Sequence, residues 1–262
     1  MLKENTIFGI EDKVAIVLER IKHFEPKDGY WVGISGGKDS TVIYDLVHKA
    51  GVKAEYHHSL TTIDAPQTIH YMREHQPDVV ITRPKMPLLQ RMIEKGTPPQ
   101  RQIRWCCGEY KERGGEGRLV ITGVRWSESS RRSKRGMMEH CLKGKEKRFL
   151  HPILDWSDTE VWEYINTNKL PVNPLYSMGY KRVGCVLCPM TRNTVKQVAD
   201  FPKIAEAWRK AFIRMFASRV ERGLECKQIS GDAWFKWWLN RDAKNPDTDD
   251  DRTIFEDDGS VE

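Results

Sequence analysis

Long apolar runs are missing from the 262-residue sequence, and cysteine is scarce. No stretch approaches the roughly 20 apolar residues that a membrane-spanning helix needs. The first residues, MLKENTIFGIEDK, lack the apolar core of a signal peptide. Six cysteines are too few for a disulfide scaffold in a chain of this length. These absences exclude membrane, secreted and wholly disordered proteins, and they predict a cytoplasmic protein without a membrane partner.

Charge is unevenly distributed along the chain. The net charge is +6, yet residues 242–262 hold nine acidic and two basic side chains. Residues 101–148 alone contain fourteen lysines and arginines against six glutamates. A basic surface attracts anionic partners, which here means a nucleotide, a sulfate or a nucleic acid. A solvated surface that the acidic end balances is the alternative.

Short apolar segments alternate with amphipathic ones. The segments that predict strands are GYWVGI (29–34), 53–58, DVVITR (78–83), RLVITGV (118–124) and RFLHPI (148–153). The segments that predict helices are 10–22, 39–49, 66–75, 87–95, one that starts at the Ser157–Glu160 capping box, one or two within 191–222 that break near Pro202, and 231–239. Strands that alternate with helices favour an α/β fold, in which a mostly parallel sheet carries helices on both faces.

The sequence predicts four parts. They are an N-terminal helix (1–28), a central α/β domain (29–190), a C-terminal helical extension (191–241) and an acidic tail (242–262). We expect the tail to be disordered, because it is highly charged and mostly acidic. The aromatic segment GDAWFKWWL at 231–239 predicts side chains that pack the helical extension.

A glycine-rich loop, SGGKDS, follows the first of these predicted strands and precedes a predicted helix. Two glycines let a backbone approach an anion closely, and the N–H groups at a helix N-terminus bind phosphate oxygens. We therefore expect the loop to hold phosphates with Ser35, Gly36, Gly37, Lys38, Asp39 and Ser40. Lys38 adds a positive charge, and Asp39 either caps the helix or holds a Mg²⁺ ion that bridges the phosphates.

Four of the six cysteines form two close pairs. Cys106 and Cys107 are adjacent, and Cys185 and Cys188 form a C-x-x-C motif. Four thiolates can hold an iron–sulfur cluster or zinc, although an adjacent pair is awkward for the hairpins of a structural zinc site. Four independent buried thiols are the remaining alternative.

Both motifs resemble those of known enzymes. The loop SGGKDS resembles the PP-loop of the ATP pyrophosphatases, which cleave ATP between its α and β phosphates. The cysteine pattern resembles the 4Fe–4S site of adenylyl-sulfate reductases, members of the phosphoadenosine phosphosulfate (PAPS) reductase family. Segments 61–72, 120–132, 151–165 and 170–185 resemble segments of that family in the same order. The resemblance implies an adenine nucleotide alpha-hydrolase-like PP-loop fold and a 4Fe–4S cluster on the four paired cysteines.

The resemblance also implies roles for two further residues. Arg125, in the Gly-x-Arg part of the 120–132 segment, is expected to donate to a phosphate or sulfate through its planar fork. Asp64 lies where the family approaches the nucleotide, so we expect it at the nucleotide or as the cap of the helix that begins at Pro66.

Two departures separate the sequence from the reductases of this family. Those enzymes usually carry a degenerate phosphate loop, because their nucleotide is already activated, whereas the intact SGGKDS suits ATP. They also carry a C-terminal Glu-Cys-Gly-Leu-His, whose cysteine attacks sulfur. This chain has Cys226 followed by Lys227, well before its end. Cys226 is therefore either a nucleophile, activated by nearby cations, or an inert thiol near a helix end.

Three functions remain open at this point. The favoured one is ATP-dependent sulfur transfer, as in the PP-loop enzymes of DNA phosphorothioation and tRNA thiolation, with a nucleic-acid acceptor and a sulfur donor protein as partners. The second is reduction of adenylyl sulfate or PAPS to sulfite, with thioredoxin or glutathione as the donor. The third is a nucleotide- or nucleic-acid-binding module with structural zinc, since a shared fold does not fix the chemistry.

Overall fold

The computed structural model describes residues 1–6, 9–141 and 146–240. The chain divides into two compact units. The sheet unit comprises Met1–His58, Pro66–Thr82 and Gly114–Val183, and the helical unit comprises Ser59–Ala65, Arg83–Arg113 and Gly184–Glu262. The predicted acidic tail at 242–262 lies outside the described residues. Within the described residues, every helix is too short or too polar to cross a membrane.

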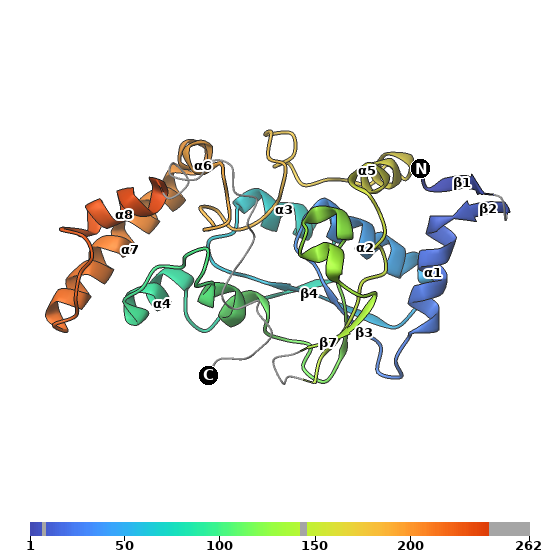
Figure 1. Ribbon diagram of the computed structural model, residues 1–262, viewed down its shortest axis with the longest axis horizontal. Coiled ribbons are helices and arrows are strands. Elements are labelled where there is room, and N and C mark those ends of the chain that lie inside the picture. Colours follow the sequence, from blue (N-terminus) through green and yellow to red (C-terminus); the bar gives the residue numbers. More distant parts are fainter. Residues whose placement is uncertain (7–8, 142–145, 241–262) are drawn as a thin grey trace. The chain divides into compact units, whose positions relative to one another are not determined.

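A six-stranded sheet with the order β5–β4–β3–β6–β8–β7 forms the centre of the sheet unit (Figure 1). Its strands are β3 (Tyr30–Gly33), β4 (Ala54–Ser59), β5 (Val79–Thr82), β6 (Leu119–Ile121), β7 (Met138–His140) and β8 (Arg148–Leu150). Strand β3 is parallel to β4 and β6, and β6 is parallel to β8. The edge strand β7 is antiparallel to β8. The predicted fold class is confirmed: the sheet is mostly parallel, it carries helices, and the C-terminal part of the chain is helical.

The helices belong to one unit or the other. The sheet unit contains α1 (Lys13–His23), α2 (Lys38–Ala50), α3 (Pro66–His75) and α5 (Asp158–Thr167). The helical unit contains α4 (Leu88–Lys95), α6 (Thr194–Asp200), α7 (Pro202–Glu221) and α8 (Gly231–Leu239). Shorter turns of helix cover Cys107–Lys111, Trp126–Glu128 and Arg132–Lys134.

Local signals in the sequence set several helix boundaries. The hydroxyl of Ser157 accepts the backbone N–H of Glu160 at 3.2 Å, and the Glu160 carboxylate accepts the N–H of Ser157 at 2.7 Å. This pair is the predicted capping box, and it satisfies two N–H groups at the start of α5. Pro202 begins α7 immediately after α6 ends, so the predicted break near this proline is also confirmed.

The N-terminal region differs from its prediction. Residues predicted to start a helix at position 10 instead form β2 (Gly9–Asp12), which pairs antiparallel with β1 (Lys3–Thr6). Helix α1 begins only at Lys13, because the Asp12 carboxylate accepts the N–H groups of the first turn. The short edge strand β7 was also not predicted, since its three residues are too few to show an alternating pattern.

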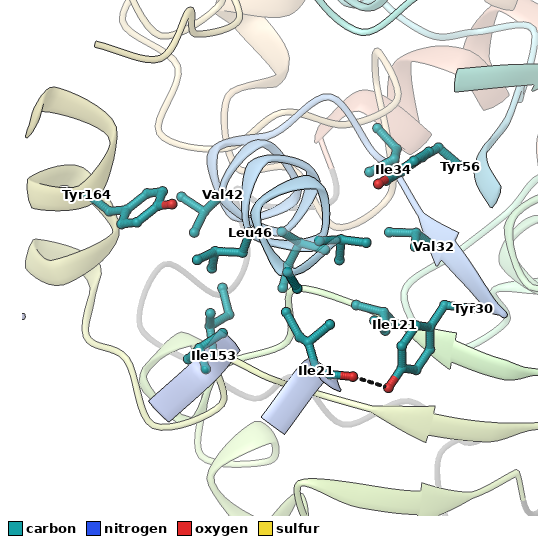
Figure 2. Packing of buried hydrophobic residues seen from close by; sticks show 14 of the residues in the cluster. Ile21, Tyr30, Val32, Ile34, Val42, Leu46, Tyr56, Ile121, Ile153 and Tyr164 are labelled. Carbon is teal, nitrogen blue, oxygen red and sulfur yellow. Dashed lines mark hydrogen bonds between the residues drawn. The ribbon is translucent and has the colours of Figure 1, made fainter. Parts of the chain in front are cut away.

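One face of the sheet packs against α1 and α2 (Figure 2). Tyr30 and Val32 of β3 are fully buried, while Trp31 between them is half-buried, as expected for side chains that alternate between two faces. Leu46 of α2 packs in the same cluster. The Tyr30 hydroxyl donates to the backbone oxygen of Ile21 in α1 at 2.7 Å. This packing fixes α2 on β3 and therefore fixes the loop that joins them.

Aromatic side chains hold the helical unit together. Helices α7 and α8 lie side by side, in orange and red in Figure 1. Trp208 and Phe212 of α7 contact Trp238 of α8, with ring centroids 4.7 and 5.4 Å apart. The prediction that the aromatic segment 231–239 packs this region is confirmed for Trp238, although Trp237 is 46% exposed.

Candidate functional site

The loop Ser35–Ser40 occupies the carboxyl end of β3. Strand β3 ends at Gly33, and α2 begins at Lys38 with Gly37 as its N-cap. The first backbone N–H groups of a helix have no partner within it, so the start of α2 presents donors and the positive end of a dipole. In α/β sheets ligands bind outside the carboxyl ends of the strands. The predicted phosphate loop therefore has the local structure of an anion-binding site.

Gly36 is the position where the loop most needs glycine. Its φ is +74°, in the left-handed region, and a Cβ atom there would lie 2.7 Å from Cγ2 of Thr68. The amide of Asn173, which is 1% exposed, donates to the Gly36 carbonyl and to the Thr68 hydroxyl, both at 3.0 Å. A buried side chain thus holds this turn in one conformation.

Four charged side chains form a network at the start of α2. Asp39 accepts the Nε–H of Arg125 at 2.6 Å, and Asp158 accepts an Nη2–H of Arg125 at 2.9 Å. The ammonium of Lys38 lies 2.9 Å from Asp158 and 3.4 Å from Asp39. Each cation therefore pairs with both carboxylates, and the formal charge of the network is zero.

Arg125 is almost completely buried in this network, with 1% of its surface exposed. Its Nη1 also donates to the hydroxyl of Ser127 at 2.7 Å and to the carbonyl of Trp156 at 3.2 Å. The close approach depends on Gly123, where a Cβ would lie 3.0 Å from backbone and side-chain atoms of Asp39. These bonds use four of the five N–H groups of Arg125, so a two-bond contact with a phosphate would require it to exchange at least one of them, and this contact stays a prediction.

Tyr176, which lies late in the chain of the sheet unit, contacts the loop Ser35–Ser40. Its hydroxyl accepts the backbone N–H of Lys38 at 2.8 Å. Burial raises the pKa of Tyr176, so the hydroxyl keeps its proton at neutral pH. This N–H is one of the donors that a phosphate on the loop would use, so Tyr176 occupies a ligand position in this structure.

Sequence reasoning missed several of these residues. Asp158, Asn173 and Tyr176 contact the loop directly, yet none was singled out. All three lie in the segments 151–165 and 170–185, whose resemblance to family segments was the available signal.

The four paired cysteines line one cavity in the helical unit. The lining of the cavity includes Cys106, Cys107, Cys185 and Cys188 together with Thr61, Leu88, Lys111 and Trp208. Within the described residues no three His, Cys, Asp or Glu side chains are grouped around a position for one metal ion. The four cysteines therefore share one cavity, and their assignment as ligands stays a prediction.

The two adjacent thiols differ in their environment. The hydrogen bond from Cys106, together with the nearby positive charges of Arg104 and Lys111, lowers the pKa of Cys107 despite its burial. Nη2 of Arg104 lies 3.4 Å from the sulfur of Cys107. The same hydrogen bond and burial raise the pKa of Cys106. Cationic neighbours favour the thiolate, which is the form that binds metals.

Cys185 contacts the segment that contains Asp64. The two residues form an isolated antiparallel β-bridge, and the Cys185 sulfur lies 3.3 Å from the hydroxyl of Thr61. The Asp64 carboxylate accepts the N–H and the hydroxyl of Thr61 at 2.7 and 2.8 Å. The structure therefore places Asp64 beside the cysteine cavity, and its predicted contact with the nucleotide is not tested.

The two remaining cysteines do not line the cavity. Cys226 lies between α7 and α8, is half-buried, and its sulfur is 3.6 Å from the carbonyl of Leu224. Cys141 follows β7 in the sheet unit and is also half-buried. Whether Cys226 acts as a nucleophile stays open.

The fold and the loop define a PP-loop type of α/β domain. A model of the phosphoadenosine phosphosulfate reductase domain matches residues 29–191. The chain belongs to this family. The phosphoadenylyl-sulfate reductase of Candida auris has a similar fold, with a TM-score of 0.51 and 21% sequence identity over 64% of this chain and 87% of that chain.

Curated relatives are similar at the level of sequence. An uncharacterised protein of Methanocaldococcus jannaschii is 28% identical over 80% of this chain and 45% of its own length. The adenosine 5′-phosphosulfate reductase of Oceanobacillus iheyensis is 30% identical over 59% of this chain and 68% of its own length. The chain thus spans under half the length of the archaeal relative and about two thirds of the reductase.

Proposed function

We propose that this chain binds ATP at the loop Ser35–Ser40 and uses it for sulfur transfer to an acceptor, with a 4Fe–4S cluster on its four paired cysteines. The observation that carries the proposal is the intact phosphate loop on the rigidly packed start of α2, in a chain that also gathers four thiols around one cavity. An intact loop suits a polyphosphate, and the four thiols supply the donor set of an iron–sulfur cluster.

The first step is adenylation of the acceptor. An acceptor oxygen attacks the α-phosphorus of Mg²⁺-ATP, the bond from that phosphorus to the bridging oxygen breaks, and pyrophosphate leaves. AMP then remains on the acceptor oxygen. The N–H groups at the start of α2 and the hydroxyl of Ser35 hold phosphate oxygens during this step. Lys38 is held near the loop by Asp158 and Asp39, which fixes the position of its charge.

The second step replaces the adenylated oxygen with sulfur. Hydrosulfide, supplied as sulfide or released from a donor persulfide by a thiol that is oxidised to a disulfide, attacks the activated atom of the acceptor. A bond to sulfur forms, and AMP leaves with the oxygen. An iron–sulfur cluster, if bound by the paired cysteines, would supply iron that can hold sulfur. Cys106, Cys107, Cys185 and Cys188 are the residues that would hold it, because all four line one cavity and thiolates are the ligands of such clusters.

A measurement of pyrophosphate release tests the nucleotide step. Anaerobically purified protein is first analysed for iron and labile sulfide, and ATP is then offered with small RNA and DNA acceptors. We expect iron and sulfide together with pyrophosphate release. Lys38→Ala should abolish that release, whereas Lys22→Ala, which removes a half-exposed lysine from α1, should not. Equal release by wild type and Lys38→Ala would refute the proposal.

The second candidate is reduction of adenylyl sulfate or PAPS. The reductase relative and the exposed position of the segment around Cys226 favour it. Here the Cys226 thiolate attacks the sulfur of the sulfonucleotide, the sulfur–oxygen bond breaks, and the nucleotide leaves. A thiol of thioredoxin or glutathione then releases sulfite, and the thiols are oxidised to a disulfide. Sulfite from adenylyl sulfate that disappears in Cys226→Ser would select this reaction.

Metal analysis distinguishes the third function, a nucleic-acid-binding module with structural zinc, from the two enzymatic functions. Zinc without iron or labile sulfide would favour it, because a structural zinc site uses the same thiolate ligands. The basic stretch 101–148 supports a nucleic-acid acceptor under the first function and a nucleic-acid ligand under the third.

A further inference from the structure

The charged side chains at the phosphate loop neutralise one another. Lys38 and Arg125 contribute two positive charges, and Asp39 and Asp158 contribute two negative ones, all within 3.4 Å contacts. The dipole of α2 adds only about half a positive charge. A triphosphate brings several negative charges, so a site for ATP needs cations beyond this network.

The segment Tyr176–Val183, which contains two basic residues, contacts the loop Ser35–Ser40 at both of its ends. A Cβ atom on Gly37 would lie 3.5 Å from the hydroxyl of Tyr176 and 3.7 Å from Cβ of Val183. Both residues therefore contact the same loop position, and the six residues between them form a turn that returns to it. Lys181 and Arg182 are the last two residues of that turn.

Lys181 and Arg182 are available for a ligand. Both are exposed, and neither has an ion pair or hydrogen bond to another residue that the structure describes. Arg182 directly precedes Val183, so its Cα lies about 3.8 Å from that of a residue in contact with Gly37. Long, flexible side chains at these positions reach an anion on the loop.

We propose that Lys181 and Arg182 bind the β and γ phosphates of the nucleotide and thereby make the site selective for ATP. This inference rests on the proposed function, because it assumes that ATP is the ligand. The Arg182 fork donates two parallel hydrogen bonds to phosphate oxygens, and the Lys181 ammonium adds a point charge. AMP has no β or γ phosphate, so its binding does not use the pair.

The test compares the affinities of the full-length protein for Mg²⁺-ATP and for AMP by equilibrium titration. We expect Lys181→Ala/Arg182→Ala to weaken ATP binding by about 10-fold or more and AMP binding by less than about 3-fold. The charge-preserving variant Lys181→Arg, which keeps the Arg182 fork, should bind ATP within about 3-fold of wild type. Raised salt should reduce the difference between wild type and the alanine variant, because exposed charges are screened.

A matched control removes two lysines from elsewhere on the sheet unit. Lys22→Ala/Lys27→Ala loses the same charge, and both residues are exposed and precede the start of β3, opposite the strand end that carries the loop. The control should leave both affinities unchanged.

Several outcomes would overturn the proposal. Equal losses for ATP and AMP would show that the pair acts on the loop's structure, and unchanged ATP affinity would show that it does not touch the phosphates. Loss of RNA or DNA binding with unchanged ATP affinity would assign the pair to an acceptor. Failure of the wild-type protein itself to bind ATP would refute the proposed function, which is a result distinct from failure of the variant alone.

Discussion

One carboxylate oxygen, Oδ1 of Asp158, lies 2.9 Å from Nζ of Lys38 and also accepts a hydrogen bond from Arg125 at 2.9 Å. Burial alone would raise the pKa of Asp158, but the bonds and charges of Lys38 and Arg125 outweigh it and lower the pKa. Asp158 is therefore ionised at neutral pH. It joins the first residue of α2 to the buried arginine behind the loop.

Asp158→Asn is expected to weaken nucleotide binding at the loop Ser35–Ser40 without changing the backbone conformation of the loop. The amide cannot neutralise Arg125, whose side chain is 2% exposed, and a buried charge that loses its partner is costly. We expect ATP affinity and pyrophosphate release to fall by about 10-fold or more, measured by titration and by a pyrophosphate assay. Asp155→Asn is the control, because Asp155 pairs with Arg20 of α1 at 2.9 Å rather than with a residue of the loop. Equal effects of the two variants would contradict a special role for Asp158.

Gly36→Ala is expected to combine backbone strain with a steric clash. Its φ of +74° costs a non-glycine residue about 1–2 kcal/mol. In addition, the new Cβ would lie 2.7 Å from Thr68 and must displace it. Gly51→Ala is a matched control, since Gly51 has φ +68° but no atom within 4 Å of its Cβ position.

The two glycine variants therefore separate strain from clash. Thermal unfolding should show a loss of stability in both, with the larger loss for Gly36→Ala. Only Gly36→Ala should lose affinity for ATP, because Gly51 ends α2 far along the chain from the loop. Equal ATP affinity in the two variants would contradict the assigned geometry of the loop.

The sequence predicts the elements whose cause is local. Strand β3 and helix α2 follow from the pattern of apolar residues. The turn between them follows from its glycines, which can adopt backbone conformations that other residues disfavour. The capping box at Ser157 is equally local. The hairpin β1–β2 was missed because its residues carry no alternating apolar pattern: Gly9–Asp12 includes exposed residues at three of its four positions.

The candidate site was only partly predictable for a different reason. Ser35–Ser40 and the four paired cysteines are visible as motifs, and each set is brought together within its own unit. Asp158 and Asn173 approach the loop from positions more than 100 residues away in the chain. Such contacts depend on how the sheet orders its strands, which apolar periodicity does not encode. For the same reason, the bonds of Arg125 to Asp39 and Asp158 could not be predicted from the sequence, and its contact with a phosphate stays a prediction.

Substitution of the cysteines should divide them into two classes. Cys107→Ser and Cys188→Ser remove thiolates that line the cavity, so we expect loss of most iron and labile sulfide and of the visible absorption of the purified protein. Cys141→Ser and Cys226→Ser should retain both, because neither thiol lines the cavity. Iron retained in full by Cys107→Ser, or lost from Cys141→Ser, would contradict the assigned ligand set.

The capping box of α5 predicts how stability depends on pH. Burial alone would raise the pKa of Glu160, but the hydrogen bonds from Lys13, at 2.6 Å, and from the N–H of Ser157 outweigh it and lower the pKa to about 2. A carboxylate whose pKa is lower in the folded state stabilises it above the unfolded value, near 4.5, and this contribution is lost as the pH falls from about 4.5 to about 2.

Glu160→Gln should therefore destabilise the protein at pH 7 and converge with wild type near pH 2, where the wild-type carboxyl is also neutral. The free energy of unfolding, measured by urea titration at pH 7, 4 and 3, checks this course. Glu19→Gln provides the control, because the Glu19 side chain is 76% exposed and its nearest cation, Lys22, is 3.8 Å away. A constant difference between wild type and Glu160→Gln across this range would show that the ionised carboxylate is not what stabilises the start of α5.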